Sequence, residues 1–356
     1  MGSSDPTYPL YAVASFLSAI MLLLVLTTSF VRQSFNLGVA FLCFWIFLEN
    51  LVNGIDSIIW SDNTDMKLGV YCDIVSRLQM FCFVVKPACT LIITRRLYRI
   101  ANLRSVESYH GRWDILSEWI LGLVIPALAA GPFYYVVQTR RFDIVEGIGC
   151  INSQEPSILS ILLLTNWIVT FPLLSVTVYY PRVAWVFFCH NRDINRFLRS
   201  NNSVTRANYF RVLALASIDI AVMLPVGIVD IAIFVILQGE EYGSIPFYPG
   251  WDKVHSNWEP LVYAYNGRKV HAYYSFTHWT SPLLSFIIFA LFGLTPEARA
   301  TYRRCTCAIA RRFGWRSTGR TREIVTTELD SIEFGVPSTL DVNPMFVPSL
   351  NMSTLA

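Results

Sequence analysis

Seven long apolar segments constrain this sequence more than any other feature. A helix needs about 20 apolar residues to cross the hydrocarbon core of a bilayer. Segments of that length cover residues 10–31, 37–60, 72–93, 115–138, 157–180, 212–237 and 273–294. They lack the alternation of β-strands, and an open sheet in lipid would leave backbone groups unpaired. The sequence therefore predicts an all-α fold, a seven-transmembrane helix bundle over residues 1–294.

The composition supports lipid as the solvent of this chain. Hydrophobic residues make up 54% of the 356 residues and charged residues only 15%, whereas soluble domains carry about a quarter charged residues. The formal net charge of +3 is small and gives no indication of a nucleic-acid partner. We therefore expect a multi-pass membrane protein surrounded by membrane lipid.

The positive charges are divided unevenly between the loops. Twenty arginines lie on the side that carries the C-terminal segment, and six lysines and arginines lie on the other side. Cytosolic loops of membrane proteins are enriched in Lys and Arg. We therefore expect the N-terminus to be extracellular and the C-terminal segment to be cytosolic.

The segment after the seventh apolar run predicts a helix on the membrane surface. Residues 295–316 place Pro296 in a first helical turn and arginines on one face, which favours an amphipathic cytosolic helix at the inner leaflet. Cys305 and Cys307 would lie there either palmitoylated or as unmodified thiols. Residues 317–356 are rich in Ser, Thr and Pro, and we expect a disordered cytosolic tail.

Short sequence matches run in order along the whole apolar region. They are Asn53–Trp60 with Asp62-Asn63, Cys72-Asp73-Ile74, Pro87-Ala88, Arg95–Ile100, Gln138, Arg141–Ile144, Gly149-Cys150, Tyr248–Trp251, Val254-His255, Ser281–Ser285, Phe292–Thr295 and Glu297-Ala298-Arg299. Each match is weak by itself. In this order and spacing the chain resembles the fungal mating pheromone receptors of the a-factor-receptor type, a fungal class of G-protein-coupled receptors common in mushrooms.

This resemblance implies a receptor rather than an enzyme, without cofactor or metal. Its ligand would be a short peptide pheromone with a C-terminal farnesyl group. It would lie in the plasma membrane and activate a heterotrimeric G protein through its Gα subunit, starting the mating response. Whether the receptor forms a homodimer stays open.

Other seven-span proteins fit the residues less well. A retinal protein needs a lysine within the seventh segment, and residues 273–294 contain none. The rhodopsin-type signatures are also missing, since the third segment ends in Thr94-Arg95-Arg96-Leu97-Tyr98. Transporters often show internal repeats with broken helices, which the sequence does not reveal. A transporter or a receptor for an unrelated small ligand is the alternative.

Cys72 and Cys150 are candidates for a disulfide. Cys72 opens the third segment and Cys150 lies in the second outer loop, so both face an oxidising compartment, where disulfides persist. A bridge would tie this loop across the mouth of the bundle. Two free thiols are the alternative.

Ionisable residues inside apolar segments are candidates for the ligand site, because they are costly in lipid and therefore usually paired or functional. Those near the outer ends are Asp56, Asp73, Arg77 and Asp230. Asp73 and Arg77 share a helix face, so a local ion pair that only holds helices in register is the alternative. The residues that could line the same pocket, or serve packing alone, are Tyr134, Trp167, His278 and Trp279.

Two deeper charges suggest a device for activation. Lys86 of the third segment and Asp219 of the sixth lie at similar depths, so an ion pair between them could form a latch that opens when the sixth helix moves about Pro225. Lys86 could instead extend to the inner interface.

Two arginines at the inner end of the third segment are candidates for contact with a G protein. They are Arg95 and Arg96. Anionic lipid and the general enrichment of cytosolic loops in arginine are the alternative explanation.

Overall fold

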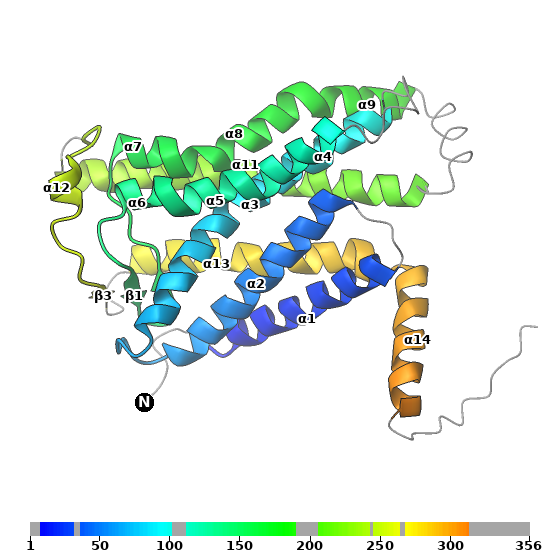
Figure 1. The fold of residues 1–356 in the computed structure, drawn as a ribbon, viewed down its shortest axis with the longest axis horizontal. Coiled ribbons are helices and arrows are strands. Elements are labelled where there is room, and N and C mark those ends of the chain that lie inside the picture. The colour runs from blue at the N-terminus through cyan, green and yellow to red at the C-terminus, as the bar shows by residue number, and fades with distance from the viewer. Residues whose placement is uncertain are drawn as a thin grey trace, which may run out of the picture. The chain divides into compact units, whose positions relative to one another are not determined.

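A computed structural model of the chain describes residues 8–31, 36–101, 112–189, 206–242, 245–263 and 268–312. Residues up to Thr306 form one compact unit, and the contacts below belong to it. Within the described ranges, seven helical segments are long and apolar enough to cross a membrane (Figure 1). The predicted fold class is therefore confirmed. The direction of the termini across the membrane stays a prediction.

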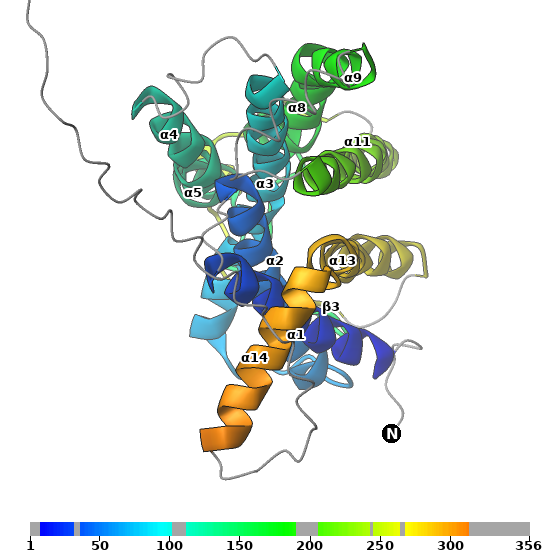
Figure 2. The same cartoon turned by 90° about the vertical axis from the view of Figure 1, so that its right-hand side faces the viewer.

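The first three spans are continuous helices. They are α1 (Leu10–Val31), α2 (Leu37–Ile59) and α3 (Gly69–Ala101). Helix α3 extends beyond the expected 72–93 at both ends, and its arginine-rich end remains helical through Ala101. It lies between α2, α5, α8 and α11, as the end view in Figure 2 shows. Its central place makes α3 the helix through which the other spans can be coupled.

The fourth and fifth spans are helices interrupted by wider π-helical turns. The fourth consists of α4 (Arg112–Trp119), α5 (Ile125–Leu128) and α6 (Tyr134–Val137), joined by π-turns at Ile120–Val124 and Ala129–Phe133. The fifth consists of α7 (Ile158–Ser160), α8 (Asn166–Leu174) and α9 (Tyr180–Cys189), joined by π-turns at Ile161–Thr165 and Ser175–Tyr179. Proline cannot donate the helical hydrogen bond and crowds the preceding turn. Pro126, Pro132 and Pro172 lie within or beside these turns, which is where such interruptions are expected.

The last two spans are α11 (Arg206–Tyr242) and α13 (Arg268–Ile288), the latter ending in a π-turn at Phe289–Gly293. Helix α14 (Pro296–Arg312) follows. The Thr295 hydroxyl accepts a hydrogen bond from the Ala298 N–H at 3.0 Å and so caps α14. The expected helix after the seventh span is thus present. The expected disordered tail lies outside the described residues.

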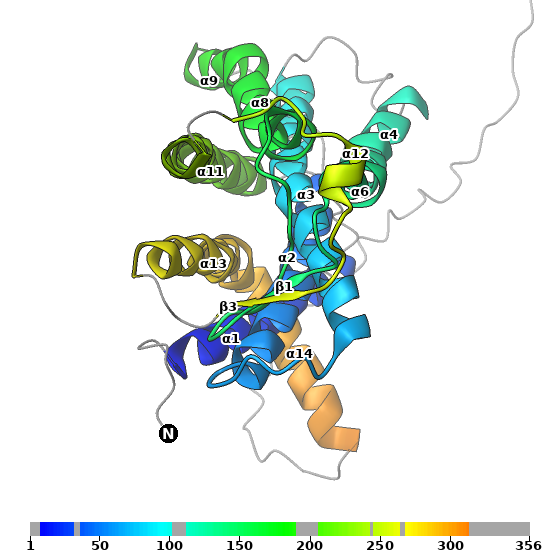
Figure 3. The ribbon, with the colours of Figure 1, turned by 90° about the vertical axis from the view of Figure 1, so that its left-hand side faces the viewer.

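One end of the bundle carries a small sheet that the sequence did not predict. Strands β1 (Asp143–Val145) and β2 (Gly149–Ile151) form a hairpin, and β3 (Leu261–Tyr263) pairs with β1 in parallel, so that Ile144 faces Val262. Figure 3 shows β1, β3 and the short helix α12 (Trp251–Val254) lying across this end of the helices. We call it the sheet end, and we call the opposite end, where Arg95 and Arg99 lie, the arginine-rich end.

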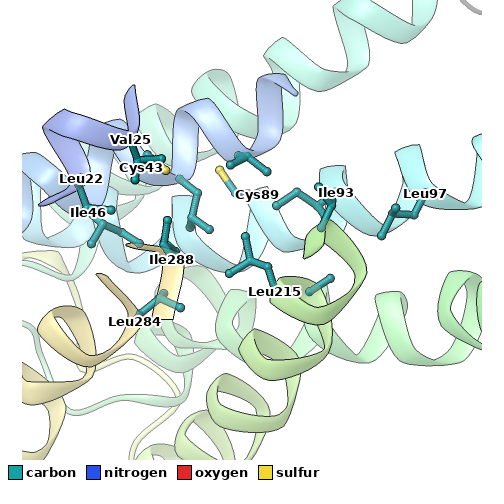
Figure 4. Close-up of a cluster of buried hydrophobic side chains, with 14 of the residues drawn as sticks. Leu22, Val25, Cys43, Ile46, Cys89, Ile93, Leu97, Leu215, Leu284 and Ile288 are labelled. Carbon is teal, nitrogen blue, oxygen red and sulfur yellow. The ribbon is translucent and has the colours of Figure 1, made fainter. Parts of the chain in front are cut away.

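The core is built around α3. In one cluster, side chains of α1, α2, α11 and α13 pack against one face of α3 (Figure 4). Its buried members include Leu22, Ile46, Ile93, Leu215 and Ile288. A second cluster joins the opposite part of α3 to the fourth and fifth spans. These two cores hold the seven spans in a fixed order around α3.

Candidate functional site

A disulfide fixes the sheet end to the bundle. Cys72 near the start of α3 is bonded to Cys150 of β2, with Cα atoms 5.4 Å apart. Trp60, Phe142 and Ile144 pack around the bridge. The predicted disulfide is confirmed, and it holds the second loop over the end of α3.

Asp73 anchors the same loop through a second contact. The Arg141 Nε atom donates to both carboxylate oxygens of Asp73, at 2.7 and 2.9 Å, and Nη2 forms a further bond to Oδ2. Hydrogen bonding to the carboxylate and its negative charge raise the pKa of Arg141. Asp73 therefore does not form the local ion pair with Arg77 that was the alternative to a ligand site. The flat guanidinium of Arg141 matches the carboxylate in two places, and Arg77 turns instead to the Ala130 carbonyl, 3.4 Å from its Nη1.

Asp56 lies beneath the hairpin rather than in an open mouth. Its side chain is 1% exposed, and Oδ1 accepts a hydrogen bond from the Tyr71 hydroxyl at 2.8 Å. Gly149 of β2 lies directly above it: a Cβ at Gly149 would come within 2.6 Å of the Asp56 Cβ. A ligand would reach Asp56 only if the hairpin moved.

Tyr134 and Trp167 lie in the packed core between the third, fourth and fifth spans. The Tyr134 hydroxyl accepts a hydrogen bond from the Ser153 N–H at 3.0 Å, which connects the fourth span to the second loop. The Trp167 indole donates to the Leu163 carbonyl at 2.7 Å and packs on Phe171. Asp230 is half-buried on α11.

His278 and Trp279 of α13 meet Tyr11 of α1. The Tyr11 hydroxyl lies 3.3 Å from His278 Nδ1, and the Tyr11 and Trp279 rings pack edge to face with centroids 5.4 Å apart. Tyr11 was missing from the sequence-based candidates because an aromatic residue at the start of a span looks like an ordinary interface anchor. Polar and aromatic groups of the first and seventh spans thus meet at the sheet end.

Midway through the bundle, a buried polar network joins three spans. Lys86 of α3 donates to Glu49 Oε1 at 2.9 Å, and the Ser281 hydroxyl of α13 donates to Glu49 Oε2 at 3.1 Å. The Asn50 amide donates to Ser281 at 3.1 Å and to Ser285 at 3.0 Å. Buried charges are expected to be paired and hydrogen-bonded in this way.

The expected ion pair between Lys86 and Asp219 is wrong, because Lys86 bonds Glu49. Asp219 of α11 accepts a hydrogen bond from Thr90 instead. Thr90 lies one helical turn beyond Lys86 on α3. Asp219 therefore lies level with Thr90 rather than with Lys86. A contact between the third and sixth spans does exist, but its partner on α3 is the threonine hydroxyl.

The same line of polar contacts continues toward the arginine-rich end. The Thr94 hydroxyl donates to the Ser175 hydroxyl of the fifth span at 3.2 Å. At the end of α3, Arg95 donates to the Ser117 hydroxyl at 2.5 Å and lies 3.6 Å from Asp114, which also binds Arg99. Arg96 is half-buried. Arg95 therefore joins the third span to the fourth in this conformation.

Of the two cysteines of α14 that could carry a lipid, the structure describes the side chain of one. The Cys307 thiol is exposed, whereas the Cys305 side chain lies outside the described residues. Within the described ranges, no cluster of three His, Cys, Asp or Glu side chains is arranged to hold a metal ion.

Known proteins match the chain along nearly all of the spans. The family described as "Pheromone A receptor" matches residues 10–313. The Pheromone B alpha 3 receptor of Schizophyllum commune is 30% identical over 327 residues, covering 87% of this chain and 49% of that protein. Pheromone receptor 1 of Mycosarcoma maydis is 29% identical, covering 84% and 83%. The Pheromone a factor receptor of Saccharomyces cerevisiae is 25% identical, covering 76% and 56%. The chain spans about half the length of the Schizophyllum relatives it matches.

Proposed function

Because the chain belongs to the pheromone A receptor family, we propose that it is a G-protein-coupled receptor for a farnesylated peptide pheromone. The observation that carries the proposal is the family match from residue 10 to residue 313, which includes every described span. The receptor would lie in the plasma membrane. Its sheet end would face outward, because the arginines gather on the opposite side.

We place the ligand site at the sheet end. The proposed contacts start from Tyr11, His278 and Trp279, because these side chains bring the first and seventh spans together toward the sheet end. Asp73 and Arg77 would form the polar wall on α3. The residues proposed to lie deeper, and to be reached only after the loops move, are Asp56, Tyr134, Trp167 and Asp230.

The activation mechanism we propose uses the buried network. Pheromone contact with His278 and Trp279 of α13 would shift Ser281, which bonds Glu49. The Thr90–Asp219 contact would then break and release α11, with Pro225 as the flexible point. Arg95 and Arg96 would exchange their contacts within the bundle for contacts with Gα. Such a change requires an element with two packed arrangements that the ligand biases.

A reporter assay tests the proposal. The chain is expressed in a fungal host that lacks its own receptor, and synthetic peptides are applied with and without the farnesyl group. The proposal expects a response that needs the farnesyl group and disappears when the Gα gene is deleted. Silence across a broad panel of peptides, with surface expression verified, would refute the ligand class and favour a transporter or a receptor for an unrelated small ligand.

A further inference from the structure

The third loop at the sheet end is attached to the ends of two spans. The carbonyl groups at the end of a helix have no partner within the helix. At the end of the fourth span, the Tyr248 hydroxyl donates to the Val136 carbonyl at 3.2 Å. At the start of the fifth span, the Ile158 and Leu159 N–H groups donate to the carbonyls of residues 246 and 247, at 3.1 and 3.0 Å. Residues 245–255 therefore cap both helix ends.

His255 adds a polar contact between this loop and the fourth span. Its Nε2 lies 3.1 Å from the Tyr135 carbonyl oxygen, and its Nδ1 lies 3.0 Å from the Trp251 carbonyl oxygen. A carbonyl oxygen can only accept a hydrogen bond. A neutral imidazole carries a single N–H, whereas the imidazolium carries two. Both contacts are hydrogen bonds only when His255 is protonated.

Three aromatic rings and the end of the fourth span surround His255. The ring is stacked on Trp251 with centroids 4.0 Å apart, and the rings of Trp258 and Tyr135 lie 5.9 and 5.4 Å away. Aromatic faces attract cations. The C-terminal end of a helix also carries partial negative charge, and Tyr135 is in the last turn of the fourth span.

Other charged groups lie on the segments that pack here. They are Asp252 and Lys253 of α12, Glu259 after it, Arg140 after α6 and Glu155 before α7. Burial raises the pKa of Glu155, and the positive charges of Lys253 and Arg140 oppose this shift. Glu155 contributes its N–H, not its carboxylate, to the capping of Val137. Glu155→Gln therefore removes the titration of this carboxyl group and keeps the backbone hydrogen bond to Val137.

We propose that protonated His255 is a positioning residue, which clamps the third loop onto the fourth span and holds the ligand mouth in its binding form. Helix α12 leads directly to β3, which pairs with β1 of the disulfide-anchored hairpin. Releasing α12 therefore loosens the sheet that covers the mouth. The effect on the ligand rests on the proposed function, but the clamp itself does not.

The first test is made without ligand. Hydrogen–deuterium exchange is measured over residues 245–258 of the receptor in lipid nanodiscs at pH 5.5 and pH 8, which bracket the range where histidine side chains change charge. After correction for the intrinsic pH dependence of exchange, protection should fall by roughly five- to ten-fold at pH 8, as expected when a hydrogen bond donated by a cation is lost. In His255→Gln, which has a neutral amide donor, protection should be low and equal at both pH values.

Glu155→Gln is the matched control, because it removes a nearby carboxylate whose pKa is raised and keeps the backbone bond to Val137. It should retain the pH dependence of the wild type. Equal protection of the wild type at both pH values, or loss of the dependence in Glu155→Gln, would overturn the clamp.

The second readout uses the farnesylated peptide that is active in the reporter assay. Its half-maximal concentration should rise several-fold between pH 5.5 and pH 8 in the wild type and stay constant in His255→Gln. If exchange depends on His255 but the peptide response does not, the clamp holds and its role in ligand binding is refuted. If no peptide is active, the exchange result still decides the clamp and only the proposed ligand class fails.

Discussion

The buried ion pair of Lys86 makes the stability of this bundle sensitive to substitution at a single residue. The Lys86 side chain and that of Glu49 are almost fully buried as an ion pair. Removing one partner of a buried pair leaves an uncompensated charge, whereas removing both can be nearly neutral. The energetic importance of Lys86 therefore depends on Glu49.

We predict that Lys86→Met lowers the free energy of unfolding by about 3–5 kcal/mol, the range observed for broken buried pairs. The double variant Lys86→Met/Glu49→Gln should recover most of this loss. Thermal unfolding of the purified receptor in one detergent measures both. If the double variant is as unstable as the sum of the single variants, the pair does not act as a unit.

Asp143 gives a prediction about pH at the sheet end. Burial raises the pKa of its carboxyl group, while a hydrogen bond from Ser153 and the charge of Arg140 oppose the shift. A raised pKa in the folded state means that the folded protein binds the proton more tightly than the unfolded chain. The contribution of Asp143 to stability is therefore fully present below the ordinary carboxyl pKa and is lost as pH rises through the raised pKa.

Asp143→Asn should remove this part of the pH dependence. The variant should gain stability relative to the wild type at pH 8 and gain less, or lose, at pH 4. Melting temperatures in nanodiscs at the two pH values provide the comparison. A difference between variant and wild type that is the same at both values would contradict the assignment.

Among the elements, the β1–β2 hairpin depends on one glycine for its fit against α2. Gly149 has a φ of 97°, and Gly250 ahead of α12 has a φ of 102°. Both would be strained by alanine. Only Gly149 faces a close neighbour, the Asp56 Cβ; a Cβ at Gly250 would meet nothing within 4 Å.

Gly149→Ala should therefore destabilise the receptor more than the matched control Gly250→Ala. A backbone conformation with positive φ costs an alanine about 1–3 kcal/mol. The steric conflict with Asp56 adds to this only at Gly149. Surface expression and melting temperature measure the difference, and equal losses in the two variants would show that the hairpin can move away from α2.

The elements also show what the sequence could predict. All seven spans were found, because an apolar run long enough for a bilayer has few other uses. The sheet was not, since three-residue strands in polar loops carry no periodic signal. The sequence also ended the third span too early and began the sixth span too late. At these two boundaries arginines interrupt the apolar pattern, but the helices α3 and α11 continue.

At the scale of the whole molecule, the polar contacts form a connected line through the bundle. The line begins at the Glu49–Lys86–Ser281 contacts, continues through Thr90–Asp219 and Thr94–Ser175, and ends at Arg95. Residue depth predicted a pair between Lys86 and Asp219, whereas Lys86 bonds Glu49 and Asp219 bonds Thr90. Their partners could not be predicted, because depth along a helix says nothing about rotation around it. The Cys72–Cys150 bond was predictable because both cysteines had to lie at one end.

We infer that pheromone binding at the sheet end changes the contacts of the arginine-rich end. Nucleotide exchange on a purified heterotrimeric G protein tests this inference, with the receptor in lipid nanodiscs and synthetic peptides added. We expect the farnesylated peptide to accelerate exchange, the unfarnesylated peptide to leave it unchanged, and Asp219→Ala to alter exchange in the absence of peptide. Saturable binding of the farnesylated peptide without any change in exchange would contradict it.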